Sequence, residues 1–255
     1  MFITMKKIIL LLMFFGTMGF AQQSNALFLE ANDLYKEGSY IKAIDIYTSI
    51  EAKGVASDDL YFNLGNAYYK LNKIAPAIYN FEKALMLNPL HSDAQNNLTF
   101  AKRMTIDDIK ILPTTFLQSF NKAVVMKFSY NTWAYLAVLM AFLAAIGFLW
   151  YHFANATRRK LLLFNLTVLS VILLMITVFF AFHNYKVVKN NRVAIIFAAK
   201  TAIKNAPTLS SDELFSLHEG TKVIVLDAVD DWKKIKIADG KSGWIIASDI
   251  RELSN

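Results

Sequence analysis

Two long stretches without charged residues stand out in the hydropathy pattern of the chain. They cover residues 133–153 and 161–182, and aromatic residues stand near the ends of the first. Each stretch is long enough to cross ~30 Å of hydrocarbon as a helix. Because residues 155–160 are all that separates helices at 131–154 and 161–183, the pattern predicts an antiparallel transmembrane hairpin. A buried hairpin in a soluble protein is the alternative.

The N-terminus carries a shorter apolar run of a different kind. Lys6 and Lys7 precede an apolar centre at residues 8–15, and the small residues Gly19 and Ala21 flank Phe20 before Gln22. This order is typical of a secretory signal peptide, here residues 1–21. An uncleaved anchor helix is the alternative, although the apolar centre is short for that role.

The charge of the chain gathers around the two long apolar stretches. The formal net charge is +7, and residues 111–190 hold seven basic side chains and no acidic one. The basic excess therefore indicates membrane flanks and not a nucleic-acid partner. The turn contains Arg158, Arg159 and Lys160, and such dense positive charge favours a cytoplasmic location for the turn. We expect a multi-pass protein of the cytoplasmic (inner) membrane with both soluble domains extracytoplasmic.

Small residues recur every four positions on the first span, at Ala137, Ala141 and Ala145. Small side chains on one helix face allow close approach, so we expect this face to pack against the second span or a partner helix. Neither span has an ionisable residue in its middle. A channel or transporter usually needs ionisable groups deep within the membrane, so the sequence excludes a channel or transporter function.

The linker at residues 111–130 mixes apolar and basic side chains. Its apolar residues recur at intervals of mainly three to four, and Lys122 and Lys127 stand among them. This spacing predicts a short amphipathic helix at the outer membrane interface, with a structured linker as the alternative. The apolar positions are Phe116, Leu117, Phe120, Val124 and Phe128.

The first soluble segment, residues 22–110, contains an internal repeat. Residues 31–50 align with residues 65–84, so that Asn32 meets Asn66 and Tyr35 meets Tyr69. A period of about 34 residues with two helices resembles the tetratricopeptide repeat. The resemblance implies repeats at about 24–57 and 58–91, followed by a closing helix. The second copy matches at Tyr61, Leu64, Gly65, Tyr68, Ala77, Phe81, Ala84 and Pro89.

The resemblance implies a partner-binding groove on the first helix of each repeat. Transferred position by position, the groove consists of Phe28, Asn32, Tyr35, Lys36, Phe62, Asn66, Tyr69 and Lys70. A clamp for a terminal carboxylate is not expected, because Phe28, Asn96 and Phe100 stand where that clamp needs basic residues. An aromatic, weakly polar groove for an extended or helical segment fits better. The alternative is that Phe28 and Phe62 only pack against the third helix.

From Arg192 onward the pattern is that of β-strands. Ile235 and Ile237 alternate with lysines, and Asp239-Gly240 predicts a hairpin turn. The order of strands and turns over residues 191–255 resembles bacterial SH3 (SH3b) domains, some of which bind cell-wall peptides. We expect Trp244 to pack within the fold. Trp232 is either a core residue or part of a ligand surface.

Catalysis is not expected from the residues at hand. The chain has no cysteine, which excludes disulfides, thiolate metal sites and a cysteine nucleophile, and its histidines are scattered. Adjacent acidic pairs usually point apart, so we interpret three such pairs as structural. They are Asp58-Asp59, Asp107-Asp108 and Asp230-Asp231. The sequence predicts no enzyme, no cofactor and no metal site.

The fold class predicted is therefore a multidomain membrane protein. It combines an all-α tetratricopeptide segment, a two-helix transmembrane hairpin and a small all-β SH3-like barrel. This order resembles the Bat (aerotolerance) family of envelope proteins. The resemblance implies partners of the Bat type, namely membrane-anchored von Willebrand A domain proteins and a MoxR-type AAA ATPase. We expect a non-enzymatic scaffold, with peptidoglycan binding or sensing through the SH3b domain as the alternative.

Overall fold

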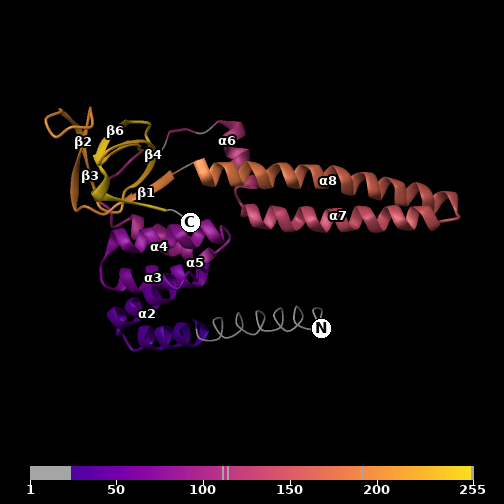
Figure 1. Cartoon of the computed structure of the whole chain (residues 1–255), viewed down its shortest axis with the longest axis horizontal. Coiled ribbons are helices and arrows are strands. Elements are labelled where there is room, and N and C mark those ends of the chain that lie inside the picture. Colours follow the sequence, from indigo (N-terminus) through magenta and orange to yellow (C-terminus); the bar gives the residue numbers. More distant parts are fainter. Residues whose placement is uncertain (1–23, 111, 114, 191, 254–255) are drawn as a thin grey trace, which may run out of the picture.

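The computed structural model describes residues 24–110, 112–113, 115–190 and 192–253 (Figure 1). The signal peptide predicted at residues 1–21 lies outside the described residues. Figure 1 shows a stack of helices, a β domain above it and a long two-helix hairpin that projects away from both.

The helical stack is built from paired antiparallel helices. Its members are a first helix at residues 24–36, α2 (Tyr40–Ala52), α3 (Asp58–Lys70), α4 (Ile74–Leu87) and α5 (Ser92–Lys102). Ser57 caps α3 by accepting a hydrogen bond from the N–H of Leu60. Gly65 lets α3 and α4 meet, because a Cβ there would lie 2.6 Å from the ring of Phe81. The expected tetratricopeptide architecture is confirmed.

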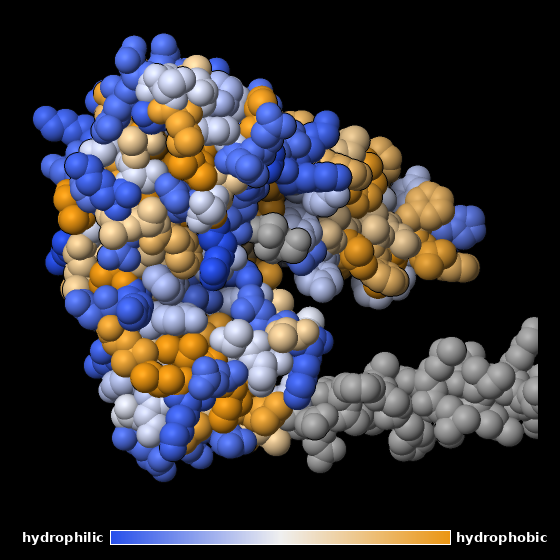
Figure 2. All heavy atoms as spheres, turned by 60° about the vertical axis from the view of Figure 1, so that its left-hand side comes forward, coloured by the Kyte–Doolittle hydropathy of each residue, from blue (hydrophilic) through white to orange (hydrophobic). Residues whose placement is uncertain are grey.

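The hairpin consists of α7 (Tyr130–Phe153) and α8 (Thr157–Asn190). Both are long and apolar enough to cross a membrane, and most of their surface is exposed. Figure 2 shows apolar side chains over the part of the hairpin that extends beyond the soluble domains. The two helices are compatible with membrane insertion.

The contact between α7 and α8 includes only part of the alanine stripe, which we expected to pack against the second span or a partner helix. Ala137 is buried against α8, whereas Ala141 and Ala145 are exposed on the hairpin surface. Gly147 lies in the contact instead, since a Cβ there would be 2.7 Å from Oγ1 of Thr167. A step of four residues rotates by about 40° beyond a full turn, so a stripe with that spacing leaves the contact face.

Helix α8 is longer than the apolar run that predicted it. It begins inside the expected turn, at Thr157, and continues past the expected end at residue 183 to Asn190. Its 34 residues correspond to ~51 Å of continuous helix. Strand β1 starts at Arg192, so the hairpin and the β domain are joined with almost no linker.

Between α5 and α7 lie the short helix α6 (Phe116–Phe120) and a π-helical turn, η1 (Asn121–Val125). The amphipathic helix expected at residues 111–130 corresponds to this pair. Thr115 and Gln118 form a reciprocal capping box at the start of α6.

The β domain is one antiparallel sheet in the order β3-β2-β6-β5-β4-β1-β7. Its strands are β1 (Arg192–Ile196), β2 (Lys200–Lys204), β3 (Glu213–His218), β4 (Lys222–Val229), β5 (Trp232–Lys236), β6 (Ser242–Ile246) and β7 (Ile250–Glu252), with the 3-10 turn η2 (Ala247–Asp249) before β7. The turn at Asp239-Gly240 joins β5 to β6, with Gly240 at φ 93°. This all-β domain has the SH3-like character expected.

The helical stack and the β domain share a hydrophobic core. Ile195 of β1 is fully buried in a cluster with Ile78 and Phe81 of α4 and Ala101 of α5. At the edge of this contact, Arg251 lies 4.5 Å above the ring of Phe197. The β domain thus covers the last helices of the repeat array, which solenoids need for solubility. The two soluble domains form one packed unit.

Candidate protein-binding site

Asparagine side chains connect the first helices of successive repeats. Nδ2 of Asn63 donates to Oδ1 of Asn32 at 2.9 Å, and Nδ2 of Asn97 donates to Oδ1 of Asn66 at 2.7 Å. The two donors are separated by one repeat period, as are the two acceptors, so the pairing recurs with the fold. We call these four residues the asparagine ladder.

A buried tyrosine, Tyr47, orients one member of the ladder, Asn32. The hydroxyl of Tyr47 donates to Oδ1 of Asn32 at 2.6 Å, and Tyr47 is almost fully buried. Burial, with a smaller contribution from Tyr35, raises the pKa of Tyr47 to about 12. The hydroxyl therefore remains a proton donor at physiological pH and fixes the orientation of the Asn32 amide.

The ladder leaves hydrogen-bonding capacity on its asparagine side chains. The bonds described use Oδ1 of Asn32 and Asn66 and Nδ2 of Asn63 and Asn97, while each amide also has a second polar atom. All four side chains are half-buried. Amides placed at intervals along a helix face can bond the backbone N–H and C=O groups of an extended peptide.

Exposed apolar and basic residues flank the ladder. Leu29 of the first helix and Phe100 of α5 are both exposed, and they occupy positions equivalent by the repeat to Asn63 and Asn66. Lys70 is exposed at the end of α3, and the Arg103 guanidinium lies 5.4 Å from the ring centre of Phe100. The face thus offers apolar contacts near both ends and positive charge along one side.

The groove residues expected from the sequence fall into three groups in the structure. Phe28 and Phe62 are packing residues, because their rings lie 5.9 Å from Tyr47 and 6.2 Å from Phe81 respectively. The half-buried Tyr35 packs on Tyr40 at 5.2 Å. Asn32 and Asn66 lie in the ladder. Tyr69 is half-buried and packs against the hydrophobic cluster that contains Ile78 and Phe81 of α4. Lys36 and Lys70 are exposed.

Sequence reasoning missed half of the ladder. Asn63 and Asn97 were not singled out, although they repeat at the same period as Asn32 and Asn66. Continuing the alignment by one further period into α5 would have found them. Phe62 also contacts the ring of His91 at 4.7 Å.

A buried carboxylate connects the helical stack to the β domain. Oε1 of Glu82 accepts from Nζ of Lys102 at 2.8 Å, and Oε2 accepts from Nζ of Lys222 at 2.6 Å. Burial alone would raise the pKa of Glu82, but the two lysines outweigh it and hold the pKa below its ordinary value. The carboxylate is therefore charged at neutral pH and bonded to both domains.

The loop after α5 makes a second polar connection. Oδ2 of Asp107 accepts from the N–H of His218 at 2.7 Å and from the Thr221 hydroxyl at 2.6 Å. Its other oxygen lies 2.8 Å from Nδ1 of His218. Burial opposes ionisation, but these hydrogen bonds lower the pKa of Asp107. Ile109 follows and packs against the core of the β domain.

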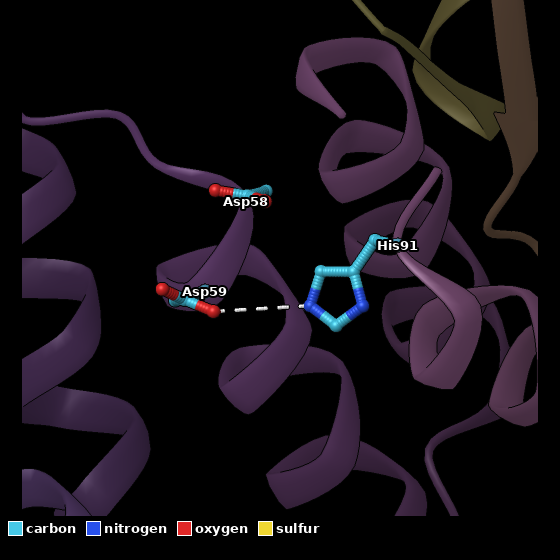
Figure 3. Close-up of side chains that lie close together, drawn as sticks. All are labelled: Asp58, Asp59 and His91. Carbon is cyan, nitrogen blue, oxygen red and sulfur yellow. Dashed lines mark ion pairs between the residues drawn. The ribbon is translucent and has the colours of Figure 1, made fainter. Parts of the chain in front are cut away.

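Asp58, Asp59 and His91 come together at the start of α3, with one ligand atom of each within 4.8 Å of the others (Figure 3). Nδ1 of His91 accepts the N–H of Ala94 and caps α5. The neutral ring then carries its proton on Nε2, which lies 3.8 Å from Oδ1 of Asp59. Asp58 accepts from Nδ2 of Asn88. Helix capping and loop closure account for this cluster.

The β domain presents two tryptophans on one face. Trp232 pairs with Ile246 and Lys234 pairs with Trp244 across β5 and β6, so the four side chains share the face opposite the core. Both tryptophans are half-exposed. Trp244, which we expected to pack within the fold, is half-buried on this face, whereas Gly243 and Ile245 face inward: a Cβ on Gly243 would lie 2.5 Å from Cγ2 of Ile203.

Comparison with known families agrees with this architecture. The family model of the tetratricopeptide repeat matches residues 59–90, and that of the bacterial SH3 domain matches residues 200–251. No curated protein matches the chain. Tetratricopeptide repeats mediate protein interactions, bacterial SH3 domains often bind peptidoglycan, and both are typically non-catalytic. The chain thus combines two domains of kinds that support a binding role with a pair of apolar helices.

Proposed function

We propose that the protein is a membrane-anchored adaptor that holds a segment of a partner protein against the asparagine ladder. The observation that supports this most directly is the periodic pairing of Asn32 with Asn63 and of Asn66 with Asn97. These amides retain hydrogen-bonding atoms for a peptide backbone. Leu29 and Phe100 supply exposed apolar contacts near the two ends of the same face.

The chemistry of the face defines the segment that fits it. A peptide with apolar side chains would contact Leu29 and Phe100, and an acidic side chain would favour the side of Lys70 and Arg103. Its backbone groups would bond the ladder amides. An extended segment is favoured over a helix, because a helix satisfies its own backbone groups.

The proposed location is the outer face of the cytoplasmic membrane. Arg158, Arg159 and Lys160 at the turn between α7 and α8 support a cytoplasmic turn, which places both soluble domains outside. The partners that we propose are membrane-anchored von Willebrand A domain proteins of the Bat type, linked to a MoxR-type ATPase. What supports this context is the order of the domains along the chain.

A photo-crosslinker at position 100, on the exposed Phe100, tests the adaptor role in membranes of cells that produce the full chain. The matched control is position 41, because Ile41 is exposed to 65% but lies on α2, the second helix of its repeat. We expect a discrete crosslinked partner at position 100, little at position 41, and a several-fold loss at position 100 when Asn66→Ala is added. Equal crosslinking at both positions would contradict the groove.

Identification of the crosslinked protein tests the family context separately. A von Willebrand A domain protein would support the Bat-type assignment. A partner of another class would be consistent with the proposed groove but would contradict the Bat-type assignment.

A second candidate function is peptidoglycan binding by the β domain. It is favoured by Trp232 and Trp244, which lie on one face of neighbouring strands, with Lys234 directly opposite Trp244. Aromatic faces of this kind stack on sugar rings and peptide planes. The full chain in detergent should sediment with purified cell wall, and Trp232→Ala should reduce the bound fraction. No sedimentation of the unaltered chain would remove this candidate.

A further inference from the structure

The short segment formed by α6 and η1 exposes large apolar side chains to the surroundings. Phe116 is exposed to 82% and Leu117 to 75%, and Phe120 and Val124 are also exposed. Helical spacing puts these residues on one side of the segment. Exposed apolar residues grouped in this way mark an interaction surface.

The segment is fixed to the outer end of the hairpin. Nδ2 of Asn184 donates to the carbonyl oxygens of Val125 and Phe128, both at 2.9 Å. Nε1 of Trp133 donates to the same Val125 carbonyl at 2.9 Å. Since both donors come from the hairpin, α7 and α8 determine where the apolar surface lies.

The height of the segment along the hairpin coincides with the end of the apolar run. Oδ1 of Asn121 lies 3.1 Å from Nε2 of His183, and His183 directly follows the uncharged stretch that ends at Phe182. Figure 1 shows α6 lying across α8 near the point where α7 begins, and not along it. A helix in this position lies in the plane of a membrane that the hairpin crosses.

The charge around the segment suits lipid headgroups. Lys122 and Lys127 are exposed beside the apolar surface, and Lys186 and Lys189 are exposed on the last turns of α8. No acidic residue stands between Asp108 and Asp212. Basic residues next to an apolar face attract anionic lipids and complete the pattern of an interfacial helix.

The geometry points to α6 and η1 as an interfacial anchor, which buries Phe116, Leu117, Phe120 and Val124 in the outer leaflet and places Lys122 and Lys127 among phosphate groups. The occupant of this surface is the lipid bilayer. The inference rests on the proposed insertion of the hairpin. Together with the hairpin, the anchor sets the height and tilt of the packed soluble unit above the membrane.

The absence of native cysteine allows a direct test in the full chain. Single substitutions Leu117→Cys, Phe142→Cys and Ile41→Cys are labelled with an environment-sensitive dye after reconstitution into phosphatidylethanolamine–phosphatidylglycerol vesicles. All three positions are exposed, so the substitutions leave the packing intact. Phe142 lies on α7 and reports hairpin insertion, while Ile41 lies on the helical stack.

We expect lipid-borne nitroxide to quench most of the fluorescence at positions 117 and 142, and aqueous iodide to quench at position 41 instead. Quenching by lipid at 142 but not at 117 would overturn the anchor and leave the hairpin in place. Absence of lipid quenching at 142 would reject the membrane placement itself. Protection of position 117 from both quenchers would indicate burial against a second copy of the chain and would also overturn the anchor.

Discussion

Replacement of Glu82 by glutamine tests whether the carboxylate between the two soluble domains holds them together. Glu82 is buried and accepts hydrogen bonds from Lys102 and Lys222. Hydrogen bonds to charged groups contribute about 1.5–3 kcal/mol each. Glutamine keeps the shape of the side chain but removes its negative charge. Its amide nitrogen is a hydrogen-bond donor and would face one of the two lysine ammonium groups, which are also donors.

The exposure of the lysines sets the size of the effect. Removing one partner of a buried pair costs about 3–5 kcal/mol when the remaining charge stays buried. Lys102 and Lys222 have side-chain exposures of 45% and 42%, so both recover hydration in the variant. We therefore expect Glu82→Gln to lower the free energy of unfolding by about 2–3 kcal/mol at pH 7, which is less than the typical cost of breaking a fully buried pair.

Thermal unfolding of the full chain in detergent and hydrogen exchange measure this loss. For a soluble unit of this size, 2–3 kcal/mol corresponds to about 4–12 °C in Tm. Exchange should rise in β1 and around Gly220, which face α4 and the loop after α5. Lys36→Gln is the control, because the pair of Lys36 with Asp33 is exposed and contributes little. A change in Glu82→Gln no larger than in the control would refute the reasoning.

Three further outcomes are expected. The free energy of unfolding should fall as the pH drops below about 4.5, because the pKa values of Glu82, Asp107 and Glu252 are lowered in the folded state. Each carboxylate contributes stability above its unfolded-state pKa, and this stability is lost as the pH falls through its folded-state pKa. Unfolding midpoints measured between pH 7 and pH 3 test this expectation. Gly65→Ala should cost about 1–3 kcal/mol in denaturant unfolding, since its Cβ would press on the Phe81 ring at 2.6 Å. Ile195→Ala should cost about 2–5 kcal/mol and loosen the domain contact, whereas Ile41→Ala, at an exposed site, should change the unfolding midpoint little.

The elements that the sequence predicted well are those with a strict period. The recurrence of one pattern at a fixed interval identified the repeats, because Gly65, Ala77 and Ala84 mark the close contacts of paired helices. The alternation of Ile235 and Ile237 with lysines identified a strand with one buried face. In both cases the signal is local, and each segment carries it without reference to the other domains.

Local spacing says less about which side chains meet a neighbouring element. The four-residue alanine stripe drifts around α7, so that Ala137 meets α8 and Ala141 does not. Trp244 lies on the outer face because Gly243 takes the inward position against Ile203. The ladder partners Asn63 and Asn97 recur at the period of the repeat, but their pairing with Asn32 and Asn66 joins neighbouring helices and is not visible within one helix.

The contact between the two soluble domains could not be predicted from the sequence. Ile195 belongs to a strand pattern and Ile78 to a helix pattern, and nothing in either pattern says that they touch. Glu82, Lys222 and Asp107 carry no motif, and their pairing depends on segments far apart in the chain. Long-range contacts of this kind depend on three-dimensional packing.

The position of the β domain limits how the proposed groove can be extended. The β domain packs on α4 and α5 through Ile195, so that end of the repeat array is covered. The first helix, at residues 24–36, is the other end of the described array and exposes Leu29 there. A partner that needs more contact area than the proposed groove offers would therefore add its own surface beside the first helix. Because α8 runs directly into β1, such a partner would be held at a defined height above the end of the hairpin.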